Sequence, residues 1–151
     1  MLWLLRHGDA ADGVPDDERP LTEKGMAQAE AAGRALRYLG ESIDICLTSP
    51  KLRAVQTAER ACEPLGVPVR VDPVLSGEPF DVTRLVAGLG DVLLVGHDPS
   101  FSLLVHDLTG AQARMKKGGL AAISKGELVL LARPSELAAI AAAAAAPVST
   151  G

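Results

Sequence analysis

Short apolar runs recur along this chain, and each is followed by a polar turn and then by a longer segment with helical spacing. The first run is Leu2–Leu5, and two later ones are Ile43–Thr48 and Asp91–Val95. Runs that are this short and this apolar predict strands buried on both faces of a sheet. Strands that alternate with helices indicate βαβ units. We therefore expect an α/β fold, with a single-domain, mostly parallel central sheet flanked by helices on both faces.

The spacing of apolar residues and the turn signals predict the remaining elements. Thr22 can cap a helix that ends near Gly40, and a second helix with apolar residues from Leu52 to Leu65 ends at Gly66. The other predicted elements are a strand over Val67–Val71, helices over Asp81–Leu89 and Phe101–Leu108, an edge hairpin of Ala121–Ser124 and Glu127–Leu131, and an alanine-rich helix over Pro134–Ala146.

Length and composition bound the kind of protein. A chain of 151 residues that are 48% hydrophobic favours one domain with a full core. We assign this domain to residues 1–147 and expect a frayed tail over 148–151. The net charge of −4 argues against nucleic acid as a partner, because a protein that binds it needs a basic face. The alanine run Ala138–Ala146 is too short to span a membrane, so no membrane association is expected.

The cysteines and the first residues bear on location. Cys46 falls in a predicted strand and Cys62 on the apolar stripe of a helix, so we expect both thiols to be buried, reduced and inert. The segment Met1–Leu5 is too short for a signal peptide and lacks a basic start. A cytoplasmic protein is therefore expected, and the sequence leaves its oligomeric state open.

Cationic and imidazole side chains stand where three of the predicted strands end. Arg6 and His7 directly follow the first strand. Arg53 comes soon after the second, and His97 follows the strand over Asp91–Val95. Open α/β sheets bind their ligands at the carboxyl ends of the strands. If these strands are parallel neighbours, the four side chains converge, and two arginines and two histidines together predict a phosphoryl-transfer pocket.

The turn after the second strand adds a helix N-terminus to this pocket. Ser49 has the chemistry of an N-cap, and Pro50 suits the first helical position. Arg53 would then lie in the first turn of the helix, near the positive end of the helix dipole. Anions are stabilised at that end.

His7 is the predicted nucleophile, because a neutral imidazole can attack phosphorus. One ring nitrogen must stay deprotonated for this, so the other needs a hydrogen-bond acceptor, for which the Gly8 carbonyl is the candidate. Arg6 and Arg53 would hold the phosphoryl oxygens and stabilise the charge that develops during transfer. We expect no metal ion and no cofactor, because these side chains already supply positive charge and hydrogen-bond donors.

Four segments of the chain, in this order, resemble the histidine phosphatase superfamily, which includes the phosphoglycerate mutases. They are Leu5–Ala10, Arg19–Ala29, Ser49–Ala58 and Val95–His97. Within the superfamily, the Arg-His-Gly-Asp-Ala opening and the short chain are most similar to the SixA-type phosphohistidine phosphatases. The resemblance implies a phosphoglycerate mutase-like fold and a metal-independent phosphatase with a phosphohistidine enzyme intermediate. It also implies that His97 donates a hydrogen bond to the phosphoryl oxygens.

The general acid is harder to assign. Many relatives carry a glutamate after the third strand that protonates the leaving oxygen, and Glu78 is the candidate here, with Asp81 second. The imidazole of a phosphohistidine leaves readily, so a phosphatase for that substrate can work without an acid. Asp9 either orders the loop after the nucleophile or repels unsuitable anions, and both interpretations stay open. His106 lies mid-helix outside any motif, and we assign it to packing or solvent.

Three functions remain open for this pocket. About twenty residues separate Ser76 from His97, so the pocket is expected to be poorly roofed and accessible to a bulky substrate. This favours the phosphohistidine of a protein partner as substrate. The alternative is a general phosphomonoesterase for sugar or other small phosphate esters, and the third function is a non-catalytic phosphate-binding module. The residues expected to bind the substrate are Arg6, Gly8, Arg53 and His97.

Overall fold

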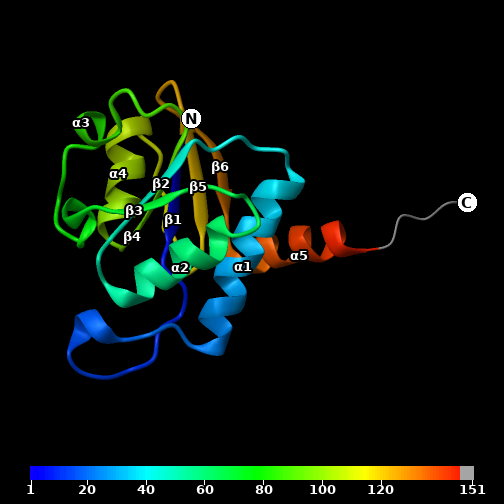
Figure 1. The fold of residues 1–151 in the computed structure, drawn as a ribbon. Coiled ribbons are helices and arrows are strands. Elements are labelled where there is room, and N and C mark those ends of the chain that lie inside the picture. Colours follow the sequence, from blue (N-terminus) through cyan, green and yellow to red (C-terminus); the bar gives the residue numbers. More distant parts are fainter. Residues whose placement is uncertain (147–151) are drawn as a thin grey trace, which may run out of the picture.

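Residues 1–146 are described by this computed structural model, and within them one six-stranded sheet passes through the middle of the protein (Figure 1). The strands are β1 (Leu2–Arg6), β2 (Ile45–Thr48), β3 (Val69–Val71), β4 (Val92–Gly96), β5 (Leu120–Ser124) and β6 (Glu127–Ala132). Their spatial order is β3-β2-β4-β1-β5-β6, which places β4 and β1 at the centre. The tail expected over 148–151, with residue 147 before it, lies outside the described residues.

Four neighbouring strands are parallel, and a hairpin adds two antiparallel ones. β1 pairs with β4, β4 with β2 and β2 with β3 in parallel, whereas β5 is antiparallel to β1 and β6 to β5. Lys125 and Gly126 join β5 to β6, and both have a positive φ (51° and 76°), as a tight hairpin turn requires. The mostly parallel sheet and the edge hairpin are therefore confirmed.

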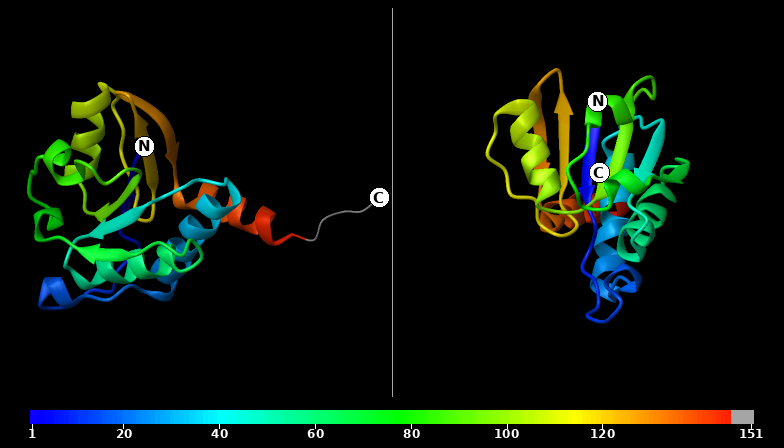
Figure 2. Two further views of the ribbon diagram at one scale, coloured as in Figure 1. Left: turned by 45° about the horizontal axis from the view of Figure 1, so that its top comes forward. Right: turned by 90° about the vertical axis from the view of Figure 1, so that its left-hand side faces the viewer.

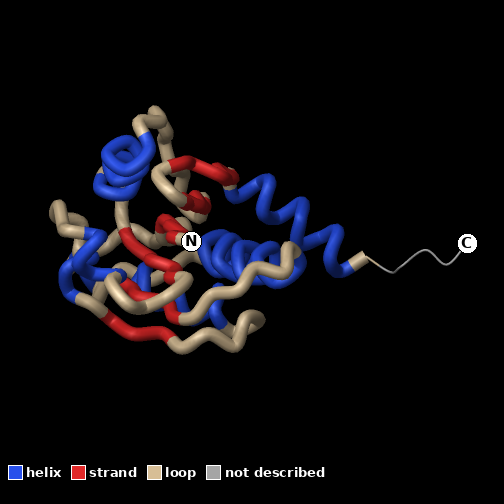
Figure 3. Tube along the Cα trace, turned by 90° about the horizontal axis from the view of Figure 1, so that it is seen from above, coloured by secondary structure: helices blue, strands red, loops and turns tan. Residues whose placement is uncertain are grey.

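Helices cover both faces of the sheet, as predicted (Figure 2 and Figure 3). Trp3 and Leu5 of β1 pack toward one face and Leu4 toward the other, because successive side chains of a strand alternate. The central strand is thus anchored on both sides. The helices are α1 (Glu23–Tyr38), α2 (Leu52–Cys62) and α5 (Pro134–Ala145) on the first face, and α3 (Val82–Val86) and α4 (Ser100–Thr109) on the second.

Two element boundaries near the third strand differ from the prediction. β3 starts at Val69 rather than at Val67. α3 ends at Val86 rather than at Leu89, because Gly88 adopts a positive φ of 74°, a conformation typical of helix termini. The segment between β3 and β4 therefore contains only one short α-helix.

The start of α1 holds the turn that follows β1. Thr22 Oγ1 accepts a hydrogen bond from Gly25 N (3.0 Å), which confirms the predicted cap. A Cβ atom on Gly25 would overlap the carbonyl oxygen of Asp9, and one on Gly8 would lie 2.7 Å from the carbonyl oxygen of Gly25. Only glycine at both positions lets the two backbones approach this closely. The turn that carries Gly8 is thereby packed directly on α1.

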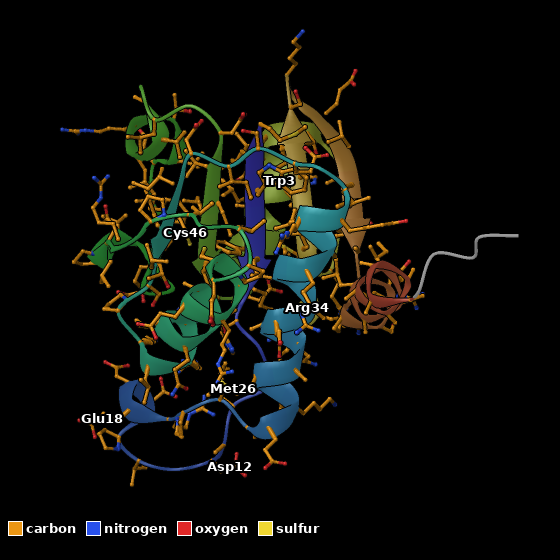
Figure 4. The ribbon with its side chains drawn as sticks, turned by 45° about the vertical axis from the view of Figure 1, so that its right-hand side comes forward. Trp3, Asp12, Glu18, Met26, Arg34 and Cys46 are labelled. Carbon is orange, nitrogen blue, oxygen red and sulfur yellow. The ribbon has the colours of Figure 1, made fainter. Side chains whose placement is uncertain are left out.

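The two cysteines are buried and unpaired, in agreement with the prediction, and both belong to the apolar cluster beneath α1 and α2. Figure 4 shows Cys46 and Trp3 within the sheet, away from the loop that carries Asp12 and Glu18. Within residues 1–146, no helix is both long and apolar enough to cross a membrane.

Candidate active site

The carboxyl ends of β1, β2 and β4 meet at one edge of the sheet. His7 N donates to Gly96 O (3.0 Å) and Ser49 N donates to Val95 O (3.0 Å), so the three strands end at the same level. The ring centroids of His7 and His97 are 5.2 Å apart. A cavity of about 320 Å³ opens here, and the four side chains predicted to converge all line it: Arg6, His7, Arg53 and His97.

His7 is held as a neutral ring with a free nitrogen. Its Nδ1 lies 2.7 Å from the Gly8 carbonyl oxygen, the predicted partner. Because a carbonyl can only accept, Nδ1 carries the proton and Nε2 keeps its lone pair. Burial first, and then the charges of Arg53 and Arg6, lower the pKa of His7 to about 4, against the opposing effect of the Gly8 bond. The ring therefore stays neutral, with Nε2 unprotonated, at neutral pH.

His97 is also a neutral ring, and it contacts Ser49, which the sequence predicts to be a helix N-cap. Burial lowers the pKa of His97 to about 3, with His7 and Arg53 adding to the shift. Its Nε2 lies 2.8 Å from Ser49 Oγ. The prediction of Ser49 as N-cap is therefore wrong: α2 begins at Leu52, and Lys51 stands at its N-cap position. Ser49 Oγ still accepts a hydrogen bond from Lys51 N (3.2 Å) in the turn before the helix, and it lies beside the imidazole because β2 and β4 are adjacent.

Two buried neutral histidines give the protein a defined acid sensitivity. The unfolded chain takes up protons at both rings as the pH falls through 6.5, whereas the folded rings stay neutral to about 4 and 3. Protons then favour the unfolded state, so the free energy of unfolding should fall by roughly 1–2 kcal/mol per histidine between about pH 7 and pH 5. Urea titrations across this range measure the slope.

A variant of the third histidine, His106, is the matched control for this pH dependence of the free energy of unfolding. His106 is exposed on α4, in agreement with its assignment to packing or solvent. His106→Gln should leave the slope unchanged, whereas His97→Gln should make it shallower. Equal slopes in wild type and His97→Gln would contradict the buried neutral state.

Arg53 lines the cavity from the first turn of α2, as predicted, but the same guanidinium also holds a loop. Its Nη1 donates to Asp16 O (2.9 Å) and its Nη2 to Asp16 Oδ2 (3.1 Å). Arg6 is fixed from the other side, where its Nη1 donates to Met115 O (2.8 Å). The Nε atoms of Arg6 and Arg53 are buried without a hydrogen-bond partner among the described residues. Both guanidiniums are thus held in place at the cavity.

Thr57 joins α2 to the turn after the nucleophile. Its Oγ1 donates to Arg53 O (2.7 Å) and accepts from Gly8 N (3.1 Å). The Thr57 hydroxyl therefore connects α2, which carries Arg53, to the turn that carries Gly8, whose carbonyl accepts from His7. The sequence signal for this role is its place one helical turn after Arg53.

Three further cationic residues at the cavity were not singled out from the sequence. Arg19 and Lys51 line it, and both contact Asp16: Arg19 Nε donates to Asp16 Oδ1 (3.0 Å) and Lys51 Nζ lies 3.7 Å from Asp16 Oδ2. The hydrogen bond from Arg53 lowers the pKa of the Asp16 carboxyl below its usual value. Lys117 lines the cavity from the turn before β5.

The three acidic candidates lie in different surroundings. Glu78 is exposed and lines the cavity. Asp81 accepts from Arg84 N (3.1 Å) as the cap of α3, and it does not line the cavity. Asp9 accepts from Thr22 Oγ1 (2.8 Å), a contact that ties its loop to the start of α1 and favours the ordering role. Among residues 1–146, no cluster of His, Cys, Asp and Glu side chains is arranged to hold a metal ion.

Paired imidazoles and guanidiniums at the carboxyl edge of a mostly parallel sheet define a phosphate-handling α/β protein. Comparisons with known proteins narrow this class. Residues 2–77 match the histidine phosphatase superfamily (branch 1). The chain therefore belongs to the histidine phosphatase superfamily.

Individual relatives cover most of the chain. An uncharacterised protein of Picosynechococcus is 32% identical, over 90% of this chain and 98% of its own. The phosphohistidine phosphatase SixA of Escherichia coli is 32% identical over 71% of this chain and 73% of its own. A structure of the protein histidine phosphatase SixA complexed with tungstate superimposes with a TM-score of 0.79 and 28% identity, covering 90% of this chain and 98% of that one. The phosphoglycerate mutase-like fold is confirmed.

Proposed function

We propose that this protein is a phosphatase that removes the phosphoryl group from phosphohistidine on a protein partner, through a phosphohistidine of its own at His7. The observation that carries this proposal is the state of the His7 ring. Its Nδ1 proton is held by Gly8 O at 2.7 Å, so the unprotonated Nε2 is the atom available to attack phosphorus.

The reaction then has two displacements. In the first, the Nε2 lone pair forms a bond to phosphorus while the bond from phosphorus to the leaving imidazole breaks, and the leaving nitrogen keeps the electron pair. In the second, a water oxygen attacks the same phosphorus, the bond to Nε2 breaks, and its electron pair returns to the ring. The water proton passes to solvent or to a carboxylate, for which Glu78 is the residue at the cavity rim.

The other side chains stabilise charge and hold the transferred group. Arg6 and Arg53 bind its oxygens through planar guanidiniums. His97 donates to a further oxygen, and the two arginines are supported from behind by Met115 O and by Asp16. Because these donors are fixed before substrate arrives, little reorganisation is needed during transfer.

A protein substrate is supported by the shape of the rim. Between Ser76 and His97 the only α-helix is α3, five residues long, so a phosphorylated side chain that projects from a protein surface has access to His7. Similarity to SixA, which is named as a phosphohistidine phosphatase, supports the same substrate.

Leaving-group basicity provides the test. Glu78→Gln should leave turnover of phosphohistidine and p-nitrophenyl phosphate nearly unchanged, because these leaving groups need little protonation. It should depress turnover of a simple alkyl phosphate, whose alkoxide needs a proton from a positioned acid, by roughly 10²-fold. Phosphate release from each substrate measures the effect, and Glu127→Gln, an exposed glutamate on β6, is the matched control.

Two results would reject parts of this proposal. A wild-type protein that prefers alkyl or sugar phosphates by a wide margin is a general phosphomonoesterase, and the phosphohistidine substrate is then wrong. If Glu78→Gln slows all substrates equally, Glu78 binds substrate or supports the loop and is not the acid. Absence of turnover on every substrate, with binding of tungstate retained, identifies a phosphate-binding module.

A further inference from the structure

We propose that a second cavity, next to the phosphoryl pocket, binds a second anionic group of the substrate, and that Lys24, Lys116 and Lys117 select for it. This inference rests on the proposed function, because it names a feature of the substrate for the same site. Neither displacement at phosphorus uses these three lysines, so the transfer mechanism leaves them without a role.

The second cavity shares a wall with the first. It has a volume of about 420 Å³, and Arg6 and Lys117 line both cavities. The two cavities are therefore neighbours, and a substrate whose phosphoryl group contacts Arg6 can place another of its groups in the second cavity. The remaining lining residues of the second cavity are Asp9, Lys24, Gln28, Lys116 and Pro134.

Positive charge gathers around these two cavities, although the chain as a whole carries −4. Seven of its 15 lysines and arginines line one or the other, against three carboxylates, those of Asp9, Glu78 and Asp98. Such a local excess attracts anions regardless of the overall charge. The seven cationic residues are Arg6, Arg19, Lys24, Lys51, Arg53, Lys116 and Lys117.

Two of the three lysines are available to a ligand. Lys117 Nζ lies 3.8 Å from Asp9 Oδ1, and the Asp9 carboxylate is shared with Thr22. Within residues 1–146, Lys24 and Lys116 take part in no ion pair, and both are exposed. Their charges are therefore not neutralised within the described part of the chain.

The backbone holds these lysines at a set distance from the nucleophile. Gly118 N donates to the carbonyl oxygens of Arg6 (3.1 Å) and His7 (3.0 Å), so the turn that carries Lys116 and Lys117 is bonded to the end of β1. Lys24 is the second residue of α1, the helix on which the turn after β1 is packed. The backbone that carries the three lysines is thus fixed relative to His7, and so is the position at which a second anion would bind.

The chemistry of the ligand follows from the ammonium groups. Lysine acts as a compact charge on a flexible stem, so it selects for negative charge more than for shape. Two sources supply such a group: a carboxylate beside the phosphohistidine of a protein, and the second phosphate of a small bisphosphate. Both would fill the same cavity.

The experiment uses substrate pairs that differ only in the second anion. One pair consists of two phosphohistidine peptides of equal length, with glutamates or glutamines beside the phosphohistidine. The other consists of a bisphosphate and a monophosphate of the same sugar. At low ionic strength, kcat/KM of the wild type should be about threefold higher for each added charge. The difference should shrink as salt is added, because exposed charges are screened.

Variants then locate the effect. Lys24→Gln combined with Lys116→Gln should lower the ratio between acidic and neutral substrates towards one, leaving only the contribution of Lys117, which is kept because it also lines the first cavity. Turnover of p-nitrophenyl phosphate, which has no second anion, should be unchanged in this variant. The control combines Lys125→Asn with Arg70→Gln, which removes two exposed charges outside both cavities. Asparagine tolerates the positive φ at Lys125, so the control should fold and keep the wild-type ratio.

Each outcome decides the proposal. Ratios of one for both pairs in the wild type, or ratios unchanged in the double lysine variant, overturn the second anion site. A lysine-dependent ratio in the peptide pair supports it with a polypeptide carboxylate as ligand, and one in the sugar pair alone supports it with a second phosphate. If the wild type hydrolyses p-nitrophenyl phosphate but neither peptide, the phosphohistidine substrate fails, while the sugar pair still tests the cavity.

Discussion

His7→Ala is expected to abolish turnover, with a loss of roughly 10⁴-fold or more, because it removes the atom that bonds to phosphorus. The fold should survive, since the one side-chain hydrogen bond of His7 is to the adjacent Gly8 carbonyl and its backbone bonds to Gly96 and Gly118 remain. Steady-state rates on p-nitrophenyl phosphate and phosphohistidine measure the loss, and urea unfolding checks the fold.

Direct trapping gives the same prediction a second readout. Wild-type protein that is quenched during turnover should carry an acid-labile, base-stable phosphate, as a phosphorus–nitrogen bond does, and His7→Ala should carry none. His106→Ala, which changes an exposed histidine far from the cavity, should behave as wild type. If His7→Ala retained more than a few per cent of activity, another residue would have to be the nucleophile.

Arg53→Ala is expected to lower the rate by about a hundredfold, or about 3 kcal/mol of transition-state stabilisation, similar to the loss of one donor from an oxyanion site. Arg53 lines the cavity and is only 5% exposed, so its charge acts in a largely buried setting. Arg53→Lys keeps the charge but loses the planar fork, so its rate should lie between those of wild type and Arg53→Ala.

Measurements of oxyanion binding distinguish the loss of the Arg53 guanidinium from a change in the loop that it contacts through Asp16. Vanadate and tungstate should inhibit the wild type by filling the phosphoryl pocket, and Arg53→Ala should bind them more weakly. Asp16→Asn, which loosens the same loop but leaves the guanidinium in place, is the comparison, and Arg70→Ala is a surface control. Equal oxyanion affinity in wild type and Arg53→Ala would remove Arg53 from the site.

The strand ends were predictable because they depend on local patterns. An apolar run of four or five residues between turn signals favours a buried strand, and a parallel sheet brings strand ends together whatever lies between them. Arg6, His7 and His97 directly follow such runs, so their convergence required only the correct strand type. The Gly8 acceptor was predictable for the same reason, since it is the next residue along the chain.

Ser49 shows where local reasoning fails. Ser-Pro before an apolar helical stripe is a strong N-cap signal, yet in this chain the serine hydroxyl bonds to His97, which lies on another strand. The hydroxyl also accepts a hydrogen bond from Lys51 N within the turn (3.2 Å). Its second contact, with His97, depends on the order β2-β4, which no pattern within the turn encodes. The helix accordingly begins two residues later than predicted, without a side-chain cap.

The contacts that the loop over 11–20 and the lysine turn before β5 make with the site were not predicted, for a related reason. Asp16 contacts Arg53 across 37 positions of sequence, and Gly118 bonds to the end of β1 across more than a hundred. Such contacts depend on the three-dimensional path of irregular segments. From the sequence, the charges of these segments are typical of solvated loops.

Because β1 lies at the centre of the sheet, His7 and Asp16 differ in how firmly the fold holds them. His7 continues the central strand, and its amide remains bonded to β4, so the nucleophile is lost only when the whole sheet opens. Asp16 stands instead on a surface loop with an exposed carboxylate, which can release Arg53 without disturbing any strand. A change in the loop over 11–20 would therefore alter the support of Arg53 and leave the backbone of His7 in place.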